Sequence, residues 1–110
     1  MRYRLIETKE AVGDVQNLVR YILVKFNNKD AAINLLDRYD IEVQKLLSFP
    51  QGYRGIGVEY RGYEIRIKSF ETYNIFFVIS EKTKKIVVLR VLKNSQNWKR
   101  ILKIETEYHF

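Results

Sequence analysis

The chain has 110 residues, no cysteine, a single histidine and a net charge of +7. The length predicts one domain spanning residues 1–110, and a hydrophobic content of 46% excludes a disordered chain. With no cysteine and only His109, neither a disulfide framework nor a thiolate or histidine metal site is expected, and we expect no cofactor. No apolar run reaches membrane-spanning length and the N-terminus lacks a signal-type apolar segment, so we expect a cytoplasmic protein with no membrane partner.

The positive charge is concentrated in the second half of the chain. Residues 1–52 contain eight Lys and Arg against seven Asp and Glu, whereas residues 53–110 contain twelve against six. An excess of cations on one half favours a polyanionic partner such as RNA or DNA, although a domain can also be this basic without a specific partner.

The first half of the sequence predicts a strand followed by two helices. Residues 2–6 alternate apolar and basic side chains, as in a short strand. Thr8 is expected to cap a helix over residues 9–26, and a second apolar stripe of helical spacing follows at 32–47. The short joint at Asn27-Asn28 predicts an antiparallel hairpin, whose apolar stripes must pack against a sheet.

The second half predicts a sheet. Residues 63–93 read as three consecutive antiparallel strands, and residues 73–79, apolar on both faces, are expected to form the central one. Residues 53–62, with three glycines, resemble a loop with at most a short strand at 58–60, and a short helix containing Trp98 follows the sheet. The expected fold is α/β (α+β), with a helical hairpin on a twisted, mainly antiparallel four-stranded sheet and a short C-terminal helix.

A charged row stands out on the first strand of this meander. Glu64, Arg66 and Lys68 alternate with apolar residues, so they share one face and span about 13 Å. The row is either a solvated outer face or the working surface for an anionic ligand, and we expect it on the face opposite the hairpin.

The order of these elements, from about residue 3 to residue 102, resembles the RelE/ParE superfamily of type II toxin–antitoxin toxins. Four stretches carry the resemblance: Leu46–Pro50, Gly62–Arg66, Tyr73–Ile79, and Val88–Lys93 with Asn97-Trp98. The resemblance implies a RelE-like fold and a toxin neutralised by a co-encoded antitoxin. That antitoxin is expected to lie across the sheet or the hairpin and to tether the toxin to operator DNA.

Two activities are compatible with this resemblance. RelE, YoeB and HigB types are mRNA endonucleases that act on the ribosome, which would make ribosome and mRNA the partners. ParE types inhibit DNA gyrase by binding, without chemistry of their own, and in that case we expect the helical hairpin rather than Arg66 to carry toxicity. We take the metal-independent endonuclease as the first hypothesis and the gyrase inhibitor as the alternative. A basic RNA-binding domain without toxicity is a third, weaker reading.

An endonuclease of this kind needs a base for the 2′-hydroxyl and cations for the phosphate charge. The predicted catalytic residues are Glu64, Arg66, Lys68, Arg90 and Lys93. Glu64 would act as base or orient Arg66. The arginine at the position of Arg90 is often structural in the superfamily, paired beneath the sheet edge, and we favour that role.

Further residues are expected to contact RNA. The predicted RNA-binding residues are Arg54, Arg61, Tyr73, Lys99 and Arg100. Two positions depart from the nuclease pattern, because Asn74 and Trp98 stand where RelE has an arginine and a tyrosine. The C-terminal Tyr108-His109-Phe110 resembles the end of YoeB but follows a helix that YoeB lacks, so we assign it no role.

Overall fold

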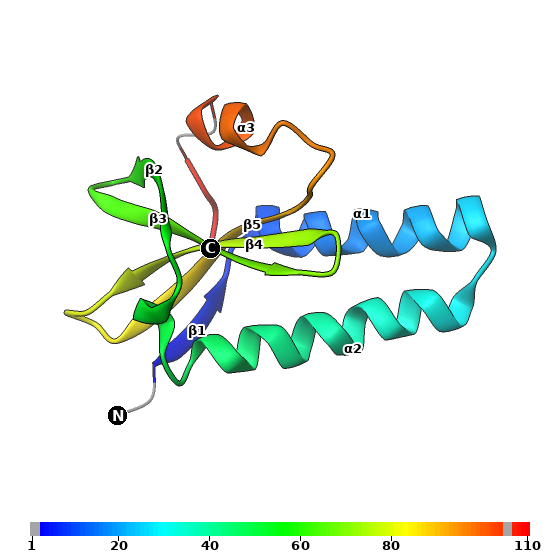
Figure 1. The fold of residues 1–110 in the computed structure, drawn as a ribbon, viewed down its shortest axis with the longest axis horizontal. Coiled ribbons are helices and arrows are strands. Elements are labelled where there is room, and N and C mark those ends of the chain that lie inside the picture. Colours follow the sequence, from blue (N-terminus) through cyan, green and yellow to red (C-terminus); the bar gives the residue numbers. More distant parts are fainter. Residues whose placement is uncertain (1–2, 105–106) are drawn as a thin grey trace.

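The computed structural model describes residues 3–104 and 107–110. A long helical hairpin packs on one face of a twisted sheet and a short helix covers the other face (Figure 1). The elements are β1 (Arg4–Glu7), α1 (Lys9–Phe26), α2 (Lys29–Leu46), a 3-10 turn η1 (Pro50–Gly52), β2 (Gly55–Tyr60), β3 (Tyr63–Phe70), β4 (Tyr73–Ser80), β5 (Lys85–Lys93) and α3 (Trp98–Ile104). None of the helices in the described ranges is both long enough and apolar enough to cross a bilayer.

Both hairpin helices begin at side-chain caps, and the cap of α1 is the one that the sequence predicts. Thr8 accepts a hydrogen bond from the Ala11 amide at 3.0 Å, and Asn28 does the same for Ala31 at 3.0 Å. Asn27, between the helices, adopts the left-handed conformation with φ of 46°. Thr8 also donates its hydroxyl to the Leu89 carbonyl at 2.8 Å, which ties the start of α1 to β5.

The sheet has the strand order β1-β5-β4-β3-β2, so β4 is central, as its two apolar faces predict. β1 runs parallel to β5, and the other neighbours are antiparallel. The sheet contains one strand more than the four expected, because β2 forms across residues 55–60. Its glycines do not prevent pairing: they accompany a bulge between Gly55 and Glu59, with Gly57 at a φ of 76°.

Two hydrophobic cores lie on opposite faces of the sheet. The hairpin core joins α1 and α2 to side chains such as Phe77 and Val88, and its centre is fully buried. The second core, on the other face, joins Phe76 and Leu89 to Leu102 of α3 and to Tyr108 of the C-terminal tail. Neither face of the central strands is therefore left bare.

The hairpin extends past the sheet at the end where α1 joins α2 (Figure 1). There the sheet no longer covers the helices, and apolar side chains meet solvent: Val24 is 78% exposed and Phe26 60% exposed. We call this region the hairpin tip and define it by Leu23, Val24, Phe26 and Ile33.

Candidate functional site

The charged row of β3 lies on the hairpin face and not, as we expected, on the opposite face. Lys68 forms an ion pair with Glu42 of α2 at 2.9 Å, and the two side chains are only 9% and 6% exposed. The Lys68 ammonium also donates to the Tyr53 hydroxyl at 2.9 Å. The expectation of a basic face opposite the hairpin is therefore wrong, since that opposite face carries the second apolar core.

Lys68 stays protonated, and its positive charge is balanced by the carboxylate of Glu42. Burial alone would raise the pKa of Glu42 and lower that of Lys68. Lys68 and Lys45 outweigh burial at Glu42, so the pKa of Glu42 falls below its usual value. The hydrogen bonds that Lys68 donates to Tyr53 and Glu42 outweigh burial at Lys68, so its pKa rises. Both groups stay charged at neutral pH, and Lys68 acts as a structural cation that joins β3 to α2.

Arg66 is bound by the segment that precedes β2, and Glu64 lies against the first residue of β2. Arg66 donates through one nitrogen to the carbonyls of Tyr53 at 2.6 Å and Gln51 at 3.2 Å. The Glu64 carboxyl lies directly over Gly55, where an added Cβ would sit 2.0 Å from its Cδ. Glu64 therefore occupies space that any larger residue at 55 would need, while remaining exposed to solvent.

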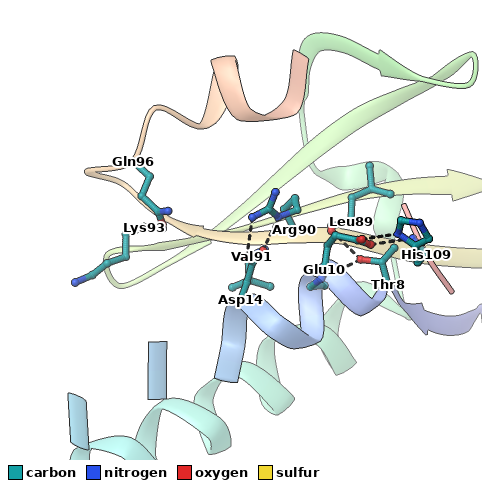
Figure 2. Close-up of polar contacts among 10 residues, drawn as sticks. Thr8, Glu10, Asp14, Leu89, Arg90, Val91, Lys93, Gln96 and His109 are labelled. Carbon is teal, nitrogen blue, oxygen red and sulfur yellow. Dashed lines mark hydrogen bonds and ion pairs between the residues drawn. The ribbon is translucent and has the colours of Figure 1, made fainter. Parts of the chain in front are cut away.

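Arg90 has the structural role that the sequence favours. Its Nε and Nη2 atoms donate to the two carboxylate oxygens of Asp14 at 2.7 and 2.8 Å (Figure 2). Asp14 also accepts from the Val91 amide at 2.9 Å. Such a two-pronged, partly buried pair fixes α1 on β5 and leaves the guanidinium occupied with protein.

Lys93 differs from the other predicted catalytic residues. Its ammonium lies 4.8 Å from the centre of the Tyr21 ring, and its side chain extends away from the Arg90–Asp14 pair (Figure 2). Its backbone amide donates to the Gln96 side chain at 2.8 Å. The five predicted catalytic residues thus do not converge on one groove, and their catalytic role stays a prediction.

The predicted RNA-binding residues are dispersed. Tyr73 packs in the hairpin core against Phe70, with ring centres 5.4 Å apart, and burial raises its pKa. Arg61 lies in the β2–β3 turn over the Tyr60 ring, and Lys99 lies over Trp98. The two remaining residues, Arg54 and Arg100, are exposed. Only Lys99 and Arg100, on α3, are neighbours, and RNA binding by these residues stays a prediction.

The C-terminal residues close the start of α1. The Lys9 amide donates to the His109 carbonyl at 2.6 Å, and Glu10 accepts the His109 amide at 2.8 Å. The other Glu10 oxygen lies 2.7 Å from His109 Nδ1 (Figure 2). Tyr108, 4% exposed, packs edge-on against Tyr60 in the second core. The sequence assigned no role to this tail. In the structure it fastens the start of α1, and we call the contacts of His109 with Lys9 and Glu10 the C-terminal clasp.

We expect the clasp to make stability depend on acid pH. The His109 amide and side chain hold the pKa of Glu10 at about 2, below its ordinary value of 4.5. Because the depressed pKa belongs to the folded state, ionised Glu10 stabilises the fold. This contribution to the free energy of unfolding is complete above about pH 4.5 and disappears as pH falls toward 2. Glu10→Gln should therefore lower Tm at pH 7, and the difference from the unmodified chain should vanish near pH 2 in thermal melts.

The matched control is Asp37→Asn, on the exposed side of α2. It should lower Tm much less than Glu10→Gln at pH 7. A Glu10→Gln chain with the same Tm as the unmodified protein at pH 7 would show that the clasp contributes nothing.

Within the described ranges no group of three His, Asp or Glu side chains could hold a metal ion. The sequence analysis did not single out the exposed tip within the hairpin, and it missed the partners of the cations, Asp14 and Glu42. A signal for the tip was present: Tyr21-Ile22-Leu23-Val24 is a run of four apolar residues, and one helix face cannot bury them all.

The comparisons with known proteins identify the class. A family model described as "ParE toxin of type II toxin-antitoxin system, parDE" matches residues 5–98, most of the chain. The protein is thus a toxin of the type II toxin–antitoxin class, and it belongs to the ParE toxin family.

The fold agrees with this assignment. A solved structure described as "Chromosomal ParDE TA system from P. aeruginosa" superposes with a TM-score of 0.67 at 19% sequence identity. The similarity covers 83% of this chain and 95% of that chain. No curated protein matches the sequence. The superfamily and the α+β fold predicted from the sequence are confirmed.

Proposed function

We propose that this toxin inhibits DNA gyrase by binding it through the hairpin tip. The main support is the exposure of Val24 and Phe26 at the end of the hairpin that the sheet does not cover. A cluster of apolar side chains in water is unfavourable and commonly marks a protein–protein contact. Membership of the ParE family favours gyrase over the ribosome, since the ParE types are those that the resemblance links to gyrase.

We further propose that a cognate antitoxin neutralises the toxin in the cytoplasm, where gyrase works. The antitoxin would carry the DNA-binding domain, so the toxin would reach operator DNA only within that complex. The family description supports the antitoxin, because it names a toxin–antitoxin system. This arrangement predicts a short reading frame beside the toxin gene that encodes a DNA-binding protein.

Ribosome-dependent mRNA cleavage is the second possible function, and the contacts of the cations favour it less. Cleavage needs cations that can reach the phosphate. Arg66 is bound to two backbone carbonyls, Lys68 to Glu42 and Arg90 to Asp14. A nuclease would have to use Lys93 and Glu64. Lys93 lies over Tyr21 of α1, whereas Glu64 lies against Gly55 of β2.

Induction of the toxin in growing cells separates these functions. A gyrase inhibitor should arrest growth with an SOS response and gyrase-linked DNA breaks, and should create no new mRNA ends. New 5′ ends that depend on translation, mapped by primer extension without an SOS response, would replace the proposal by the endonuclease. Unchanged growth on induction would contradict any toxic function.

A further inference from the structure

The helix α3 carries three cations on the side that faces solvent. Lys99, Arg100 and Lys103 are exposed, and their spacing of three and four residues places Lys103 beside both of the others. The other side of α3 is anchored, because Leu102 is 3% exposed in the second core and Trp98 packs against that core. The anchored side fixes the helix, so the three cations project away from the sheet. We call Lys99, Arg100 and Lys103 the α3 basic face.

The protein does not neutralise these three charges. Within the described ranges, no carboxylate lies at ion-pair distance from the α3 basic face, and Glu107 of the C-terminal tail pairs with none of its cations. The Lys and Arg side chains that do have a carboxylate partner lie elsewhere: Arg38, Lys45, Lys68, Lys84 and Arg90. The α3 basic face is therefore available to an external anion.

The arrangement of the cations favours a DNA duplex over single-stranded RNA. Lys99 and Lys103 are about 6 Å apart along the helix axis, and a duplex carries one phosphate charge per about 1.7 Å of its own axis. Each of the three cations can therefore meet a phosphate. Single-stranded RNA is held largely by aromatic rings on which its bases stack. Trp98, the aromatic residue of α3, packs against the second core with the Lys99 ammonium 5.6 Å from its ring centre, so α3 has no free ring for a base.

We propose that the α3 basic face binds the backbone of the DNA duplex on which gyrase acts, so that the toxin recognises the gyrase–DNA complex rather than gyrase alone. This inference rests on the proposed function, because gyrase brings the duplex to the toxin. The hairpin tip contacts the protein part of the complex, and α3, on the other face of the sheet, contacts the DNA. Phosphate contacts carry no base-sequence information, so the contribution is independent of the DNA sequence. Ile104 is exposed on the same helix but is neutral, and it takes no part in these contacts.

The test measures the Kd of the full-length toxin for gyrase, with and without a linear duplex of mixed sequence. The duplex should lower the Kd of the unmodified toxin about tenfold. The triple variant Lys99→Gln/Arg100→Gln/Lys103→Gln should bind free gyrase as the unmodified toxin does, but gain less than about twofold from the duplex. With the duplex present, the slope of log Kd against log salt should be smaller by about 2.7 for the triple variant, and by about 0.9 for each single replacement.

The matched control is the triple variant Arg4→Gln/Lys9→Gln/Lys82→Gln. It removes the same three charges from exposed positions outside α3, so it should keep both the tenfold gain and the salt dependence of the unmodified toxin. Melting curves should show both triple variants folded with a Tm close to that of the unmodified chain, since every replaced side chain is exposed. The single replacements test the inference if a triple variant does not fold.

Failure of this inference can be told apart from failure of the proposed function. If the toxin binds neither free gyrase nor gyrase with the duplex, both fail. If it binds gyrase but the duplex changes the Kd of the unmodified toxin and of the α3 variant equally, the inference alone fails. Weaker binding of the α3 variant to free gyrase would make α3 a protein contact and would also overturn it. Loss of affinity for ribosomes carrying mRNA, with the gain from the duplex unchanged, would assign the α3 basic face to RNA instead.

Discussion

Replacing Asp14 with alanine should destabilise the fold by about 3 kcal/mol. Asp14 is the carboxylate that receives both guanidinium bonds of Arg90 and the Val91 amide, and the two paired side chains are 11% and 17% exposed. Removing it takes the anion from a largely buried cation and the acceptor from a backbone amide. The measurement is the shift in the urea unfolding midpoint at constant slope.

Two further variants define the origin of that loss. Asp14→Asn keeps an acceptor oxygen but no charge, so its loss should fall between those of the unmodified chain and Asp14→Ala. Asp40→Ala, on the exposed side of α2, should cost less than about 0.5 kcal/mol. If Asp14→Ala unfolded at the same urea concentration as the unmodified chain, the pair would not hold α1 on β5.

The double variant Val24→Gln/Phe26→Gln should weaken gyrase inhibition at least about tenfold. Both substitutions replace exposed apolar surface with a neutral residue that helices tolerate, so they remove the proposed contact without changing charge. The readout is the toxin concentration that halves supercoiling activity. Because both side chains already face solvent, the Tm of the variant should stay close to that of the unmodified chain.

Ile104 provides a matched control on the opposite side of the molecule. It is 67% exposed and belongs to α3, the helix that packs on the sheet face opposite the hairpin. Ile104→Gln should inhibit gyrase as the unmodified toxin does. If the tip variant inhibited gyrase as strongly as Ile104→Gln does, the hairpin tip would not be part of the surface that binds gyrase.

Much of the fold could be predicted because local chemistry and periodicity agree. Thr8 and Asn28 are good helix caps followed by apolar stripes, and the two-sided apolar pattern of residues 73–79 requires a central strand. β2 was predicted only as a loop with at most a short strand at 58–60, because its glycines favour a loop. In the structure Gly57 forms part of a bulge and Gly55 makes room for Glu64, which are roles that only a paired neighbour reveals.

The site was harder to predict because alternation shows which residues share a face but not which element covers that face. Glu64, Arg66 and Lys68 do share one. The element that covers this face is α2, through Glu42. Glu42 lies one position before Val43 of the apolar stripe, and the periodicity of α2 does not mark it as a partner of Lys68. The structural role of Arg90 was foreseen, but its partner Asp14, 76 residues earlier, could be found only in the folded chain.

Whether the purified toxin acts on gyrase itself is tested most directly by a supercoiling assay with gyrase, relaxed plasmid and ATP. A gyrase-binding toxin should block supercoiling in proportion to its concentration, and pre-incubation with the antitoxin should restore activity. Full supercoiling at a large molar excess of folded toxin, together with cleavage of mRNA on translating ribosomes, would contradict the function proposed for the hairpin tip.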